Sequence, residues 1–244
     1  MPANRLAHAQ LFYVPIAAAF EAERVADRVD WAVVESCDSP GAGSARGASP
    51  RGVQGVVAAA LARLDELGWE RYLLIGDSHG QAATIEVALA RPDRVTGVFI
   101  SHAAARYKLS GDRPAMTPAV RDAAQQLLDT DYRSFARAVT QLTLGLADDE
   151  WVERWLAEVP HPVAKSILGD LSDREPELVT RLAEIDVPVL LGQHKGCVMW
   201  TPESFADACA AVPGAGVIRC EGIPVQDLGF IDAVRGVASG VASS

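Results

Sequence analysis

Residues 71–94 of this chain read RYLLIGDSHGQAATIEVALARPDR, and this stretch decides the fold. A short apolar run at residues 72–75 predicts a strand, and residues 81–90 predict a helix. Between them, GDSHG at residues 76–80 places Ser78 at the tip of a tight turn. The order of strand, turn and helix around a G-x-S-x-G pattern is typical of a nucleophile elbow, which presents a serine hydroxyl at the amino end of a helix.

Both glycines of this turn have a steric reason to be there. A Cβ at Gly76 or Gly80 would collide with the neighbouring strand or helix, and the serine between them is forced into a strained backbone conformation. The free N–H groups at the start of the helix favour a developing anion in front of the serine. The pattern therefore predicts that Ser78 is a nucleophile.

Strands and helices alternate along most of the chain. Strands are predicted at residues 10–14, 31–35, 72–75, 95–101, 188–192 and 216–220, and helices at 20–29, 52–67, 81–90, 202–211 and 230–238. Thr201 is expected to cap the helix that begins with Pro202. This succession predicts an α/β fold, with a mostly parallel sheet of about six strands flanked by helices.

Residues 107–184 interrupt the alternation and contain no predicted strand. Helices are predicted there at residues 118–128, 134–144 and 150–158. Carboxylates together with Trp151 and Trp155 suggest a polar outside and an apolar underside. We predict that residues 107–184 form a helical cap insert over the carboxyl ends of the strands, and that residues 1–106 and 185–244 form the α/β core domain.

Composition and charge exclude several kinds of partner. The chain has 244 residues, enough for one sizeable domain, and its net charge of −10 includes no cluster of Lys and Arg. We therefore expect neither nucleic acid nor a membrane as a partner. The amino-terminal residues lack the pattern of a signal peptide, which predicts a cytoplasmic protein. The sequence leaves the oligomeric state open, with a homodimer as one alternative.

The cysteines give no sign of a disulfide framework or a metal site. They are scattered without C-x-x-C spacing, at Cys37, Cys197, Cys209 and Cys220. Cys197 follows a loop near the expected site, where a thiol could react or fill buried space. Because neither a cluster of metal ligands nor a dinucleotide fingerprint occurs, we expect no cofactor.

On these features the chain resembles the α/β-hydrolase superfamily. The resemblance rests on the serine turn, on the loop SPGAGS at residues 39–44, on the helical insert after residues 95–101, and on IDVPVLL at residues 185–191 leading into a late strand. It implies a sheet that lacks the first two strands usual in the family. It also implies chemistry by a relay of serine, histidine and an acid.

Two members of that relay are missing from their usual places. The acid of the family follows the late strand, where this chain has GQHKG at residues 192–196, with Lys195 or a neighbour in place of an aspartate. The histidine of the family follows the last strand, but no histidine follows His194 in this sequence. The resemblance therefore implies a degenerate triad, with Glu221 and Asp227 as the carboxylates that the last loop could offer.

Two histidines are candidates for a substitute base. His102 ends the strand next to the serine strand, at the edge where substrates bind in parallel sheets. His194 lies in the loop that usually carries the acid. Each is either a catalytic base for Ser78 or a structural histidine.

The resemblance also suggests the groups around the serine. The backbone N–H of His79 would be one donor of an oxyanion hole, and an amide near Ile16 or Ala17 would be the second. The His79 side chain and Asp77 would line the pocket, with Asp77 positioning the loop.

Three functions follow from these residues. The first is an enzyme that acts on an ester, lactone or thioester of a small apolar molecule through Ser78 and a non-standard base. The second is a non-hydrolytic lyase, isomerase or cyclase that reuses the pocket. The third is a catalytically silent pseudo-hydrolase that binds a small molecule.

Overall fold

The computed structural model describes residues 9–102, 118–142, 149–173, 181–195, 201–221 and 227–238. Its centre is a six-stranded sheet with the order β2-β1-β3-β4-β5-β6, and every described pair of neighbours is parallel. The strands are β1 (Ala9–Val14), β2 (Ala32–Glu35), β3 (Tyr72–Asp77), β4 (Val95–Ser101), β5 (Val189–His194) and β6 (Gly216–Cys220). The predicted parallel sheet of about six strands is confirmed.

Helices cover both faces of this sheet. The α-helices are α1 (Glu23–Ala26), α2 (Gly52–Leu67), α3 (Gln81–Ala90), α4 (Pro118–Thr130), α5 (Tyr132–Leu142), α6 (Asp149–Glu158), α7 (His161–Asp173), α9 (Pro202–Ala211) and α10 (Leu228–Ala238). The shorter 3₁₀ turns are η1 (Ala19–Ala22), η2 (Gly43–Ala45) and η3 (Ser78–Gly80). Side chains of α2, α3 and α9 pack on one face, and those of α1 and α10 pack on the other.

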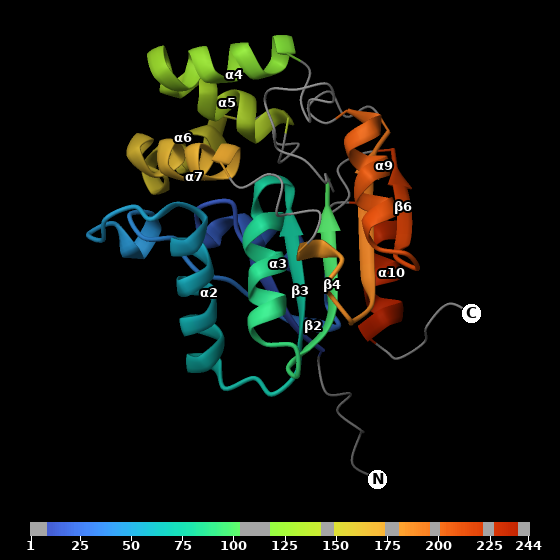
Figure 1. Ribbon diagram of the computed structural model, residues 1–244. Coiled ribbons are helices and arrows are strands. Elements are labelled where there is room, and N and C mark those ends of the chain that lie inside the picture. Colours follow the sequence, from blue (N-terminus) through green and yellow to red (C-terminus); the bar gives the residue numbers. More distant parts are fainter. Residues whose placement is uncertain are drawn as a thin grey trace.

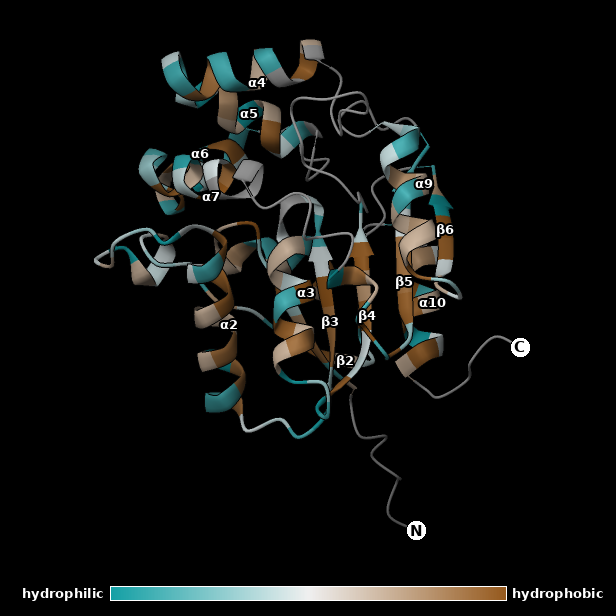
Figure 2. Cartoon of the chain, in the orientation of Figure 1, coloured by the Kyte–Doolittle hydropathy of each residue, from teal (hydrophilic) through white to brown (hydrophobic). Residues whose placement is uncertain are grey.

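The buried strands explain the apolar runs in the sequence. β3 is buried along its whole length, and the second half of β4 is too, because helices lie on both sides of them. Figure 2 shows β3, β4 and β5 largely brown, whereas teal residues are frequent on the outer helix α4. Among the described residues, no helix is long and apolar enough to cross a membrane.

Several predicted bounds agree residue for residue with the structure, namely those of α2, α3, α9, β4 and β6. The predicted cap of α9 is also confirmed, since the Ser204 amide donates to Thr201 Oγ1 at 3.2 Å. The helix predicted at residues 20–29 is confirmed in part: the 3₁₀ turn η1 leads into a single α-helical turn, α1, which ends at Ala26.

Helices α4 to α7 come between β4 and β5 in the chain and lie above α2 and α3, on the side of the sheet where the strands have their carboxyl ends (Figure 1). Helix α7 was not predicted from the sequence, because two prolines lie at its start and proline usually interrupts a helix. Pro162 stands in the first helical turn, where a missing N–H breaks no helix hydrogen bond. The division into a core domain and a cap at residues 107–184 stays a prediction.

Helix α6 contacts η1 and α1. Arg154 of α6 donates to Glu23 at 2.6 Å, and its guanidinium lies 4.8 Å from the ring centre of Phe20. The Phe20 ring also meets the rings of Trp151 and Trp155 at centroid distances of 5.6 and 6.4 Å. The short segment around Phe20 is therefore held by the sheet on one side and by α6 on the other.

Candidate active site

The turn after β3 has the strained geometry that its sequence predicts. Ser78 has a φ of +49°, and the chain passes from β3 through η3 directly into α3. A Cβ at Gly76 would lie 2.1 Å from Thr84 Oγ1, and one at Gly80 would lie 2.7 Å from the carbonyl oxygen of Val14. Both positions therefore exclude a side chain. Holding a serine in this region costs about 1–3 kcal/mol, so the surrounding packing must enforce it.

His102 is the other described non-glycine residue with a positive φ, at +51°. It directly follows β4, whose Ser101 pairs in register with Asp77 of β3. His102 is only 3% exposed, and Ser78 has no exposed surface. The two strained residues thus stand at the ends of neighbouring strands, at the edge of the sheet where parallel strands present their carboxyl ends.

The His102 ring is oriented by a carboxylate. Its Nδ1 lies 3.0 Å from Asp77 Oδ1, so that Nδ1–H donates to the carboxylate when this nitrogen carries the proton. The other ring nitrogen, Nε2, is buried and has no hydrogen-bond partner among the described residues. In that tautomer Nε2 holds a free lone pair, which is the form a general base requires.

Asp77 is shared between two cationic or potentially cationic groups. Its second oxygen, Oδ2, accepts from Arg24 Nη2 at 3.2 Å, and the same nitrogen donates to the Tyr13 hydroxyl at 2.7 Å. Burial alone would raise the pKa of Asp77. The hydrogen bond and charge of His102, together with the charge of Arg24, outweigh burial and lower that pKa below its ordinary value. Asp77 is therefore an ionised carboxylate at the back of the His102 ring.

A second buried carboxylate, Glu21, lies on the loop after β1. Its Oε2 accepts from the Ile16 amide at 2.7 Å, and its Oε1 accepts from the amides of Ala17 and Ala18 at 2.8 and 2.9 Å. Burial raises the pKa of Glu21 to about 7, although these three amides and the charge of Arg24 oppose the shift. The amides predicted for the oxyanion hole, at Ile16 and Ala17, are thus bound to a carboxylate in this structure.

Glu21 was missed by the sequence analysis. A single predicted helix at residues 20–29 made it one surface carboxylate among others. The available signal was its spacing, because a glutamate at the third position of a short helix can reach back to the amides before that helix.

Comparison with solved structures identifies the fold of this chain. A hydrolase from Oleispira antarctica matches with a TM-score of 0.77 over 94% of this chain and 90% of that chain, at 14% identity. A haloalkane dehalogenase loop variant from Bradyrhizobium elkanii matches with 0.73, over 97% and 91%, at 16% identity. An enol-lactonase from Burkholderia xenovorans LB400 matches with 0.66, over 96% and 90%, at 18% identity. This chain has the α/β-hydrolase fold. No family model and no curated protein matches the sequence.

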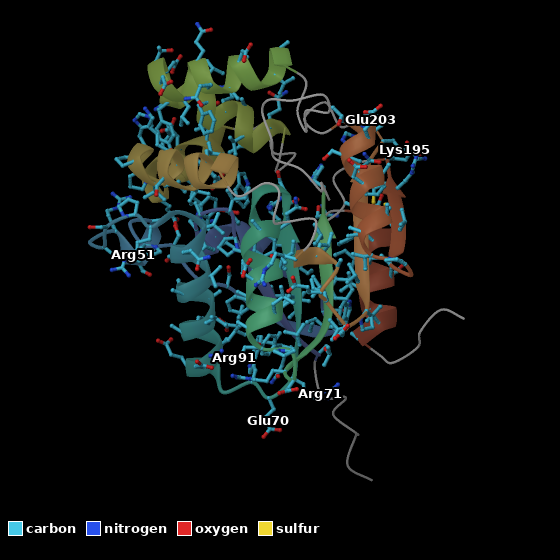
Figure 3. All side chains as sticks on the ribbon, in the orientation of Figure 1. Arg51, Glu70, Arg71, Arg91, Lys195 and Glu203 are labelled. Atoms are coloured by element: carbon cyan, nitrogen blue, oxygen red, sulfur yellow. The ribbon has the colours of Figure 1, made fainter. Side chains whose placement is uncertain are left out.

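The position after β5, where the α/β-hydrolase family usually carries its acid, holds a lysine in this chain. Lys195, just after β5, forms an ion pair with Glu221, which follows β6. Figure 3 shows Lys195 at the outer end of the sheet, beside α9 and β6. Asp227 accepts from the amides of Gly229 and Phe230 at 2.9 and 3.3 Å, and so caps α10. Both carboxylates from the last loop therefore have structural partners.

His194, at the end of β5, lies beside His102. The two rings meet edge to face, with their centres 6.4 Å apart. Within the described part of the chain the His194 ring has no hydrogen bond to a carboxylate, which distinguishes it from His102. The structure thus brings together Ser78, Asp77, His102 and His194 at one edge of the sheet.

Two predicted site groups lie outside what the structure describes. These are Cys197 and the side chain of His79. The backbone of His79 belongs to η3, and its predicted role as an oxyanion donor stays a prediction. Among the described residues, no group of three potential ligands could hold a metal ion.

Proposed function

We propose that this protein is a serine-dependent acyl-transfer enzyme that cleaves an ester, lactone or thioester of a small apolar molecule. Ser78 is the nucleophile, His102 is the general base, and Asp77 orients the imidazole. The observation that carries the proposal is the Asp77–His102 hydrogen bond of 3.0 Å, with Nε2 of the same ring buried and unpartnered among the described residues. This arrangement supplies base and acid from residues that the family pattern does not use.

The steps follow from these positions. His102 Nε2 takes the proton of the Ser78 hydroxyl as Ser78 Oγ bonds to the substrate carbonyl, and Asp77 stabilises the imidazolium that results. The imidazolium then gives its proton to the leaving oxygen or sulfur as that bond breaks, leaving an acyl-serine. Water, deprotonated by the same nitrogen, releases the acid and restores the serine.

Two features support the substrate class. One solved neighbour is named as an enol-lactonase and another as an N-acyl homoserine lactone degrading enzyme, with a TM-score of 0.67 for the second. A positive dipole end at the start of α3 favours the oxyanion that acyl transfer forms.

A fluorophosphonate probe tests the nucleophile and the base together. We expect the probe to modify Ser78 in the wild-type protein, as read by intact mass and peptide mapping, and not to modify Ser78→Ala. His102→Asn should lower the rate of modification about 10²- to 10⁴-fold, the usual contribution of a general base. Asparagine suits this test because it tolerates a positive φ and can still donate to Asp77.

The same substitution at the neighbouring ring is the matched control. His194→Asn should change the rate of modification less than about threefold, since no carboxylate orients that ring among the described residues. If His194→Asn abolishes modification and His102→Asn does not, the base is His194. If a folded wild-type protein is not modified at all, the acyl-transfer proposal fails.

A second candidate, a small-molecule-binding protein without catalysis, is favoured by one observation. Glu21 occupies the amides of Ile16 and Ala17, so one half of the expected oxyanion hole is engaged within the protein. This candidate predicts that small apolar lactones raise the melting temperature without being hydrolysed. Hydrolysis of any such lactone that disappears in Ser78→Ala would reject it.

A further inference from the structure

The amide of Ile16 lies next to the serine turn. β1 pairs with β3 so that Val14 is opposite Gly76, and the next residues of both strands continue toward Ile16 and Ser78. The contact is close, because a Cβ on Gly80 would lie 2.7 Å from the Val14 carbonyl oxygen and 3.2 Å from that of Pro15. The N–H of Ile16 therefore belongs to the loop that continues from β1 alongside the serine turn, where the second oxyanion donor is expected.

Glu21 divides its bonds unevenly between its two oxygens. Oε2 accepts only from Ile16, whereas Oε1 accepts from both Ala17 and Ala18. A proton added to this carboxylate therefore goes to Oε2, which gives up one hydrogen bond, rather than to Oε1, which would give up two. The neutral acid keeps the loop in place through Oε1 and frees the Ile16 amide, because a protonated hydroxyl oxygen is a poor acceptor for it.

The three amides and Arg24 favour the charged form of Glu21, but the other groups around it do not. Burial raises the pKa of the Cys37 thiol to about 12 and raises the pKa of the Tyr13 hydroxyl, so both face Glu21 uncharged. Arg24 is the nearby cation, but it is hydrogen-bonded to Asp77 and Tyr13. Asp38, on the loop after β2, accepts from the Ala19 amide at 2.8 Å and adds a negative charge close by.

Packing also confines the Glu21 carboxylate. Its neighbours in sequence are held by the cap, since Phe20 packs on Trp151 and Glu23 pairs with Arg154. Glu21 itself has no exposed surface. Protonation of Glu21 can therefore free the Ile16 amide with less rearrangement than a movement of the whole segment around Glu21 would require.

We propose that Glu21 is a positioning residue for acyl transfer: its charged form withholds the Ile16 amide from the reacting oxygen, and its neutral form leaves that amide to the oxyanion. The inference rests on the proposed function, because it concerns the oxyanion formed at Ser78. A charged Glu21 beside this amide would also repel the oxyanion, so the charged form opposes acyl transfer in two ways.

The first experiment compares Glu21→Gln with the wild-type protein in the rate of fluorophosphonate modification of Ser78 between pH 5.5 and 8.5. We expect nearly equal rates at pH 5.5 and a rate about 10- to 100-fold higher for the variant at pH 8.5, the range that one oxyanion donor contributes. The ratio should change with a midpoint near pH 7, the pKa expected for Glu21. Using the ratio removes the pH dependence that the two proteins have in common.

Glu23→Gln is the matched control, because Glu23 lies two residues further along and pairs with Arg154 at the surface. The rate of modification of Glu23→Gln, divided by that of the wild type, should not change with pH. A lower rate for Glu21→Gln at every pH would overturn the proposal, since Glu21 would then only hold the loop in its active shape. Absence of modification in the wild type and in both glutamine variants would instead refute the acyl-transfer function.

The second experiment does not depend on reactivity. The amide proton of Ile16 should shift with a midpoint near pH 7 in two-dimensional ¹H–¹⁵N spectra of the wild-type protein, and those of Ala17 and Ala18 should shift less. Glu21→Gln should remove the titration and Glu23→Gln should retain it. An Ile16 amide that does not titrate between pH 5.5 and 8.5 would overturn the proposal whether or not Ser78 reacts.

Discussion

Two carboxylates with no exposed surface have opposite pKa shifts: Asp77, which precedes Ser78, and Glu21, which binds the amides of the loop after β1. Asp77 touches a guanidinium and an imidazole, so its charged form is favoured in spite of burial. Among the described residues, the Glu21 carboxylate has backbone amides as its only direct partners, and burial raises its pKa to about 7. The difference shows that burial by itself does not decide the charge of a carboxylate; the direct partners do.

The largest effect is expected from neutralising the paired carboxylate. Asp77→Asn should slow fluorophosphonate modification of Ser78 about 10³- to 10⁴-fold, because an amide that donates to His102 favours the wrong tautomer. Stopped assays over hours with mass detection measure such rates. Asp65→Asn, at an exposed ion pair with Arg94, is the control and should not change the rate. Modification of folded Asp77→Asn at the wild-type rate would show that Asp77 does not serve the base.

The next largest effect is expected from replacing Arg24, whose charge acts on both Asp77 and Glu21. Arg24→Gln should lower the free energy of unfolding by about 3–5 kcal/mol, because it leaves buried Asp77 with one partner fewer and leaves the Tyr13 hydroxyl without its donor. Urea unfolding followed by circular dichroism measures this change. Arg63→Gln, whose pairs with Glu35 and Glu66 are partly exposed, should cost less than about 1 kcal/mol. Equal losses of unfolding free energy for Arg24→Gln and Arg63→Gln would contradict the conclusion that Arg24 stabilises buried Asp77.

A smaller effect is expected in the pH dependence of stability. Between pH 4.5 and about 7, folded Glu21 keeps a proton that the unfolded chain releases. Its contribution to stability is therefore full below pH 4.5 and is lost as the pH rises through about 7. Over that window the loss is up to about 3 kcal/mol. Asp77 works in the opposite direction, and its contribution is lost only when the pH falls below its ordinary range.

Glu21→Gln separates these two contributions. The variant should lack the decline between pH 5 and 8, while keeping the loss of stability at lower pH that depends on Asp77. Urea midpoints at a series of pH values measure both. Parallel curves for the variant and the wild type would mean that Glu21 is already ionised throughout.

The smallest effect concerns the contact of α6 with the segment around Glu21. Arg154→Ala removes the ion pair with Glu23 and the stacking on Phe20, and should destabilise the protein by about 1 kcal/mol because the side chain is partly exposed. Hydrogen exchange of the amides at residues 16–18 should become faster, and exchange near Asp77 should not change. Arg133→Ala, paired with Glu153 elsewhere on the cap, should leave both regions unchanged.

The serine turn could be predicted from the sequence because its causes are local. Gly76, Ser78 and Gly80 lie within five residues, and the strand and helix that flank them have strong patterns of their own. The bounds of α2, α3 and α9 followed for the same reason, since capping residues and periodicity mark them. The helix predicted at residues 20–29 forms as η1 and α1 but ends at Ala26, and local propensity did not indicate that the Glu21 side chain is buried.

The candidate site could be predicted only in part. Strand order placed His102 beside Ser78, and the structure adds the carboxylate that orients its ring. That partner was assigned only to positioning the loop, because nothing in the sequence indicates that Asp77 and His102, 25 residues apart, share a hydrogen bond. Arg24, 53 residues from Asp77, was not identified at all.

The amino-acid sequence by itself determined the alternation of strands and helices, the strained serine between two glycines, and the absence of a histidine after His194. Only the tertiary structure decided which carboxylate meets a cation and which meets backbone amides. The physical reason is that backbone sterics act over a few residues, whereas the charge of a buried group depends on the solvent excluded and on the partners that packing brings to it from distant parts of the chain.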